Sequence, residues 1–242
     1  MKKRIIAIMM MFAILGTSLP VHATEEKEIL FREVAWGVNY EDACNIVSDI
    51  DWYDMHGEYM KKYPVGDILY GYGEGIDIEN SDINVIASPW NNNNISVAGY
   101  TTESISMYFA FVPNDGVLTK DLSDTALYGA EYEFLTQKPI EMFDDLVAKM
   151  CSLYGDDYET KERTNHLDTK ITTAVWRGKE NTAVSVRLED DSEDYEYAED
   201  RIYIGYAWEN GDELLQQASD TIDQMNISAE EGAYGNNDVS GL

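Results

Sequence analysis

The chain has 242 residues, of which 46 are acidic and 17 are Lys or Arg, so its formal net charge at pH 7 is −29. Such a balance leaves no basic surface to replace the counterions of nucleic acid or anionic lipid, and it excludes binding to either. With 44% hydrophobic and 12% aromatic residues the chain can form a core, and its length suits one large domain or two small ones.

The first 23 residues have the pattern of an export signal. Three basic residues at 2–4 precede an apolar run at 5–15, and small residues stand at the cleavage position that ends at Ala23. The apolar run is short for a bilayer, and no later segment approaches the roughly 20 residues that a membrane span needs. We therefore predict a signal peptide over 1–23 and a secreted or surface-located protein; an uncleaved N-terminal anchor is the alternative.

The segment after the signal predicts a first helix with Asn39 as its N-cap. Apolar residues then recur at helical spacing and predict one buried stripe of Ala43, Ile46, Val47 and Ile50. A second helical stretch is expected over 53–63, where Pro64 ends it.

Strand patterns follow up to residue 138. The glycine-rich segment 67–78 predicts two short strands or a bent edge strand. The strongest strand pattern is 95–112, in which Met107 and Tyr108 point to opposite faces. Alternation also predicts a strand over 126–134, with one face formed by Tyr128, Ala130, Tyr132 and Phe134.

The second half repeats this order of elements. Pro139 suits the first turn of a helix that ends at the C-cap Gly155. Three strands are expected next, over 170–177, 182–189 and 201–208, followed by a helix over 212–225 and a frayed tail over 226–242.

The pattern predicts an α+β protein of two consecutive modules, each a helix followed by antiparallel strands, with the helices packed on one face of the sheet. The modules are expected at 24–138 and 139–225.

Two cysteines, Cys44 and Cys151, fall on predicted helices, one in each half. An even pair outside the cytoplasm can form a disulfide, and such a bridge would tie the halves together. Buried free thiols are the alternative, because cysteine also serves as a small apolar side chain.

The segment Phe31–Asp42, which contains an aromatic-Arg pair and Trp36-Gly37 before the helix, looks like the start of the first helix in many uncharacterised secreted proteins of Gram-positive bacteria. The order of elements over 30–225 resembles the β-lactamase inhibitory protein and its relatives. This resemblance implies tandem modules that bind a protein or an envelope component through the open face of a sheet. No inhibitor loop is matched, so the resemblance does not imply β-lactamase as the target.

Residues for catalysis or metal binding are scarce. After the signal only His56 and His166 could serve a nucleophile, and no Gly-x-Ser-x-Gly elbow is present. No close pair of ligands predicts zinc. The acidic segments 49–54 and 189–194 have ligands that calcium prefers, but neither matches the EF-hand loop. We therefore expect no catalytic residue, no cofactor and no metal site.

Aromatic residues on the predicted strands are the remaining candidates for a contact surface, because an uncovered sheet face with aromatic side chains can bind a partner. These residues are Tyr100, Tyr108, Tyr128, Tyr132, Trp176, Tyr203, Tyr206 and Trp208. The alternative is that they belong to the core.

The sequence thus predicts a secreted, monomeric, non-enzymatic interaction module whose aromatic, acid-rimmed sheet face binds a protein or cell-envelope ligand. Its acidic rim favours a basic partner. Two alternatives stay open: an extracellular hydrolase that uses paired carboxylates, and a calcium-dependent surface protein.

Overall fold

A computed structural model describes residues 27–55, 63–80, 82–89, 95–165, 168–190 and 200–235. The predicted signal peptide, His56 and His166 lie outside these residues. Eight strands form one antiparallel sheet, and its order is β1-β2-β5-β6-β10-β9-β8-β7. These strands are β1 (Trp52–Met55), β2 (Asn84–Pro89), β5 (Ser104–Phe111), β6 (Thr125–Thr136), β7 (Glu159–Thr164), β8 (Lys170–Arg177), β9 (Thr182–Asp190) and β10 (Asp200–Trp208).

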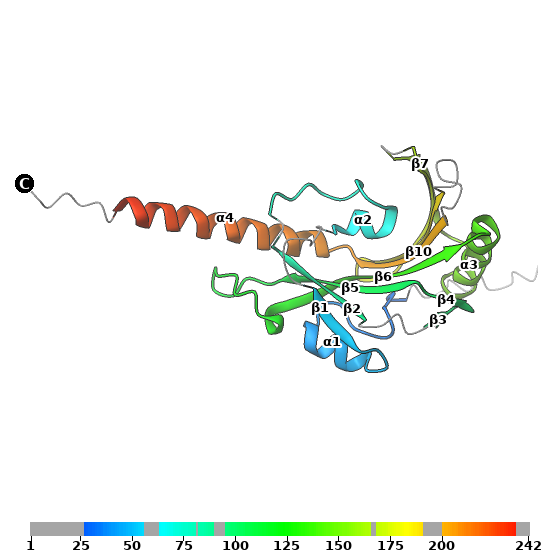
Figure 1. The fold of residues 1–242 in the computed structure, drawn as a ribbon, viewed down its shortest axis with the longest axis horizontal. Helices are drawn as coiled ribbons and strands as arrows, with labels where there is room; N and C mark the ends of the chain where they lie inside the picture. Colours follow the sequence, from blue (N-terminus) through cyan, green and yellow to red (C-terminus); the bar gives the residue numbers. More distant parts are fainter. Residues whose placement is uncertain are drawn as a thin grey trace, which may run out of the picture.

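The other elements lie around this sheet (Figure 1). They are α1 (Tyr40–Ile46), α2 (Val65–Tyr70), the short hairpin β3 (Ser96–Val97) and β4 (Tyr100–Thr101), the 3₁₀ helix η1 (Leu122–Asp124), α3 (Pro139–Tyr154) and α4 (Gly211–Gly235). The α+β class that the sequence predicts is therefore confirmed. None of the described helices is long and apolar enough to cross a membrane.

Helices cover both faces of the sheet, so the prediction that they pack on one face only is wrong. Trp176 of β8 shares a face with its cross-strand neighbour Val184, and its indole nitrogen donates to the carbonyl of Gly155 at the end of α3. Arg187 lies three positions after Val184 and so projects from the opposite face, where it donates to the carbonyl of Ile68 in α2. Both α2 and α3 are amphipathic, and each buries its apolar side against the sheet.

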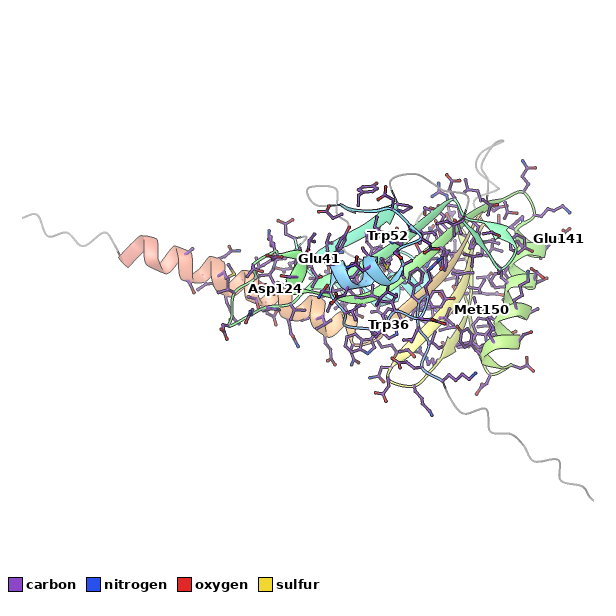
Figure 2. The ribbon with its side chains drawn as sticks, turned by 90° about the horizontal axis from the view of Figure 1, so that it is seen from below. Trp36, Glu41, Trp52, Asp124, Glu141 and Met150 are labelled. Carbon is purple, nitrogen blue, oxygen red and sulfur yellow. The ribbon has the colours of Figure 1, made fainter. Side chains whose placement is uncertain are left out.

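Figures 1 and 2 show the same division into two layers of helices. In Figure 1, α2 lies on one side of the sheet and α1 and α3 lie on the other. Figure 2 views the second side, with α1 over one part of the sheet and α3, which carries Glu141 and Met150, over another. The helix α4 begins beside α2, where the Asp212 carboxylate accepts from the backbone nitrogen of Val65, and its far half projects away from the body.

The segment that contains α2 differs from the sequence prediction. Residues 65–70 are helical rather than extended, because Ile68 and Leu69 are buried together against the sheet and Pro64 precedes the first turn. Gly71 and Gly73 have φ of 92° and 90°, conformations that suit a loop and not a strand. Residues 53–55, at the start of the second predicted helix, belong to β1; the rest of that prediction falls mostly outside the described residues.

Most of the remaining predicted elements are confirmed, but the single strand predicted over 95–112 is divided into β3, β4 and β5. Asn39 caps α1 by accepting from the backbone nitrogen of Asp42, although α1 is only seven residues long and Ile46 is exposed. The helix α3 ends at Gly155 as predicted, and strands β8, β9 and β10 match their predicted ranges within one residue. The predicted tail begins too early, because α4 continues to Gly235.

The two halves of the chain meet at the centre of the sheet. The four strands before residue 139 occupy one side of it, the four after that residue occupy the other, and β6 pairs with β10 along the junction. Buried side chains from both halves belong to one continuous cluster. Whether the halves are separate modules stays a prediction.

Candidate functional site

A pocket of about 370 Å³ lies on the face of the sheet that carries α2. Its floor comes from the four central strands β5, β6, β10 and β9, and one wall comes from α2 and the chain on either side of it. The pocket is lined by Tyr63, Asp67, Tyr72, Ser104, Ser106, Tyr108, Glu131, Glu133, Arg187, Glu189, Arg201 and Tyr203. It therefore combines four tyrosines with four carboxylates and two guanidinium groups.

Arg187 is the buried charge at the base of this pocket, with 4% of its surface exposed. Its Nε donates to Glu189 at 2.8 Å, and its Nη2 donates to Glu131 at 3.1 Å. Its Nη1 donates to the carbonyl oxygens of Asp67 and Ile68 at 3.1 and 2.7 Å. One guanidinium thus joins β9 and β6, the two strands on either side of β10, to the backbone of α2.

The Arg187 guanidinium also stacks on the ring of Tyr203, 4.1 Å from its centroid. Such contacts between a cation and an aromatic face are attractive, and more so where water is excluded. Tyr203 is therefore held between the buried arginine and the open pocket.

Glu131 is the most perturbed carboxyl in the pocket. Burial raises its pKa to about 7, because loss of water disfavours the charged form more than Arg187 favours it. The hydroxyl of Tyr108 lies 3.5 Å from its Oε1, and burial also raises the pKa of this tyrosine well above its ordinary value. The two side chains come from the neighbouring strands β5 and β6, and both line the pocket.

Glu133, two residues along β6, also lines the pocket, and 19% of its side chain is exposed. Ser104 donates a hydrogen bond to its Oε2 at 2.8 Å, and Tyr203 donates a long one to its Oε1 at 3.5 Å. Arg201 pairs with the same Oε1 at 3.2 Å. The side chain of Arg201 is half exposed, in contrast to that of Arg187.

The loop after α2 forms the rim of the pocket. The Oδ1 of Asp67 accepts hydrogen bonds from the backbone nitrogens of Gly73, Glu74 and Gly75, which holds the loop in a tight curve. Arg163 of β7 donates to the carbonyl oxygen of Tyr72, whose side chain is exposed at the rim. The loop is thus fixed both to its own helix and to the edge of the sheet.

Two of the eight aromatic residues that the sequence singled out, Tyr108 and Tyr203, line this pocket. The others do not join them. Tyr128, Tyr132 and Trp176 are buried in the core. They therefore cannot belong to an exposed contact face.

The last three aromatic candidates lie elsewhere. Tyr206 packs against Phe31 on the α3 side of the sheet. Trp208 is partly buried near Gly37. Tyr100 is on the β3–β4 hairpin, where its hydroxyl donates to Asp145 of α3. The predicted single aromatic surface is therefore wrong, because its members are divided between the two faces of the large sheet and the β3–β4 hairpin.

The charged residues of the pocket were missed by sequence reasoning. Arg187 interrupts the apolar run of β9, and Glu131 and Glu133 alternate with apolar residues in β6. A charged residue between apolar residues of a predicted strand is the signal that could have identified them. Such a charge, if buried, needs an oppositely charged or hydrogen-bonding partner nearby.

The other predicted features have the following outcomes. Cys44 and Cys151 are free cysteines, so no bridge ties α1 to α3. Within the described ranges no group of three or more His, Cys, Asp or Glu could hold a metal ion. Part of the acidic segment 189–194 lies outside those ranges.

Comparison of the chain with protein-family models, with curated proteins and with solved structures found no match.

Proposed function

We propose that this protein is a secreted interaction module that binds a basic segment of a partner protein in the pocket on its sheet. The observation that carries the proposal is the composition of that pocket: the carboxylates of Asp67, Glu131, Glu133 and Glu189 outnumber the guanidinium groups of Arg187 and Arg201, and four tyrosine rings surround them. Carboxylates and aromatic faces together favour a cationic group over an anionic or apolar one.

The charge of the whole chain supports the same class of partner. With a net charge of −29, the protein attracts a basic protein over distances of about 10 Å at moderate salt and repels an acidic one. The long-range field speeds encounter, whereas the pocket supplies the specific contacts.

A labelled basic peptide provides the first test, by fluorescence anisotropy at low and at physiological salt. We expect the Glu133→Gln variant to bind about three- to tenfold more weakly, because the change removes a negative charge from the pocket lining. The matched control is Glu141→Gln on α3, an exposed glutamate that lies on the other face of the sheet. If both variants weaken binding equally, the attraction comes from net charge alone and the pocket is not the site.

One observation favours a second candidate, an extracellular hydrolase that uses paired carboxylates. Glu131 has a raised pKa while Glu133 stands nearby in a hydrogen-bonded setting, which is a pairing that acid and base catalysis requires. Incubation with purified cell-wall polysaccharide, followed by measurement of new reducing ends, tests it. If the wild type produces new reducing ends and Glu131→Gln does not, the hydrolase is favoured. If the wild type produces none, the hydrolase is dismissed.

Secretion and the tandem arrangement belong to the same proposal. The N-terminal pattern and the resemblance to the β-lactamase inhibitory protein support export and two related modules that contribute to one binding face. N-terminal sequencing of the protein from culture medium tests the first part: a mature chain that begins near Thr24 is expected, and protein that retains the first 23 residues in the cell fraction would contradict it.

A further inference from the structure

The pocket already holds two guanidinium groups, and they differ in how deeply they are buried. Arg187 is buried and hydrogen-bonded to two carboxylates and two backbone carbonyls. Arg201 pairs with Glu133, and half of its side chain is exposed. The pocket is thus built for guanidinium chemistry, with one permanent guanidinium below and a more exposed one at the mouth.

The carboxylate that Arg201 contacts is positioned without it. Ser104 donates to Glu133 Oε2 from β5, and Tyr203 approaches Oε1 from β10. Only 19% of the Glu133 side chain is exposed, so its orientation is limited by neighbouring strands. If Arg201 moved away, Glu133 would keep its place and would face the pocket as an unneutralised carboxylate.

We propose that the pocket receives an arginine side chain of the partner protein, which replaces Arg201 on Glu133. In the unbound protein Arg201 occupies this carboxylate and competes with the partner. The inference rests on the proposed function and goes further, because it names the side chain that is recognised and the residue that it displaces.

Arginine suits this position better than lysine. Its planar guanidinium can form two parallel hydrogen bonds to one carboxylate and can stack on an aromatic face, whereas an ammonium group is compact and strongly hydrated. Glu133 supplies the carboxylate and Tyr72 an exposed ring at the rim. The stacking of Arg187 on Tyr203 shows the same type of contact within the pocket.

The test uses the full mature chain and a short fluorescein-labelled peptide of repeated Gly-Ser-Arg units, with matched peptides in which lysine or citrulline replaces arginine. We expect Arg201→Ala to bind the arginine peptide about two- to fivefold more tightly than the wild type, since a partly exposed ion pair of modest strength no longer competes with the peptide. A double variant that carries both Arg201→Ala and Glu133→Gln should lose this gain in affinity. The citrulline peptide should bind neither protein.

The outcomes separate the two proposals. Suppose that the wild type binds the arginine peptide, that Glu133→Gln binds it more weakly, and that Arg201→Ala binds it no more tightly than the wild type. Then a basic ligand in the pocket is supported, and the displacement of Arg201 is wrong. Equal affinity for the arginine and lysine peptides would overturn the preference for guanidinium. If neither protein binds either basic peptide, or if Glu133→Gln has no effect, the proposed function itself fails. Near-ultraviolet circular dichroism checks that Arg201→Ala retains the native fold.

Discussion

Arg187 is the residue that links the pocket, the sheet and α2. Its guanidinium is paired with Glu131 and Glu189 and caps two carbonyl oxygens of α2. We expect Arg187→Met to lower the free energy of unfolding by about 3–5 kcal/mol, because two carboxylates remain in a poorly hydrated place without their counter-charge. Urea denaturation measures this loss in the free energy of unfolding, and Arg201→Met is the control.

Arg201 forms an ion pair with Glu133 in which half of its own side chain is exposed, so its replacement should cost less than about 1 kcal/mol. Equal losses in the Arg187→Met and Arg201→Met variants would show that burial of the Arg187 network does not matter for stability.

Glu131 makes stability depend on pH. Burial raises its pKa in the folded protein to about 7 from an ordinary value of 4.5. Between these values the folded state binds the proton more tightly than the unfolded state, so the contribution of Glu131 to the free energy of unfolding falls as pH rises through this window.

Replacement of Glu131 by glutamine removes this titration. We therefore expect the stability of Glu131→Gln relative to the wild type to increase from pH 5 to pH 8, as measured by urea denaturation at several pH values. A difference that stays constant over this range would contradict the raised pKa.

At the scale of elements, α2 lies close to the sheet, and Gly205 of β10 makes this possible. A Cβ atom at Gly205 would stand 2.4 Å from the carbonyl oxygen of Ile68, which is backbone and cannot turn aside. At Gly129 of β6 the nearest atom is the Cδ1 of Ile68, the end of a flexible side chain.

Gly205→Ala should therefore cost about 1–3 kcal/mol of stability, because α2 must shift to relieve the overlap. We expect Gly129→Ala to cost less, since Ile68 can change its side-chain conformation. Thermal unfolding of the two variants measures both losses of stability. A larger loss in Gly129→Ala than in Gly205→Ala would mean that α2 moves easily away from the sheet.

A bulge in β6 determines which tyrosines face the pocket side. The register with β5 shifts between Tyr108 and Phe109, so Tyr128 no longer shares a face with Tyr132. Tyr128 instead donates to the carbonyl of Tyr63 and touches Gly211 at the start of α4, while Tyr132 packs against Phe31. Simple alternation could not predict this change, because one extra residue reverses every side chain beyond it.

At the scale of the whole molecule, the two halves share one sheet and one core. The pairing of β6 with β10 extends from Asp200–Thr136 to Ala207–Gly129, and Phe31 from the first half packs on Tyr206 from the second. We therefore expect one cooperative unfolding transition, with the same midpoint by far- and near-ultraviolet circular dichroism. Two separated transitions would indicate that the halves fold independently despite this junction.

The sequence predicted the regular elements better than the pocket. Strands β8 to β10 and helix α3 follow from apolar periodicity and from turn residues such as Gly155, which are local signals. The helix α2 escaped prediction because the three glycines that follow it, Gly71, Gly73 and Gly75, suggest a loop or a bent strand. Contacts with distant strands stabilise it, through burial of Ile68 and Leu69 and through the hydrogen bonds from Arg187 to its carbonyl oxygens. Of the pocket, only Tyr108 and Tyr203 were anticipated.

By itself the sequence determined the acidic charge, the α+β class and most of the strands, because charge and periodicity are properties of neighbouring residues. Tertiary structure alone decided that both faces of the sheet are covered and that Glu131, Glu133 and Arg187 converge beside α2. These three residues belong to two strands more than fifty positions apart in the chain, and β10 lies between those strands in the sheet. Strand order and the positions of the helices bring them together, and neither is encoded in any local pattern.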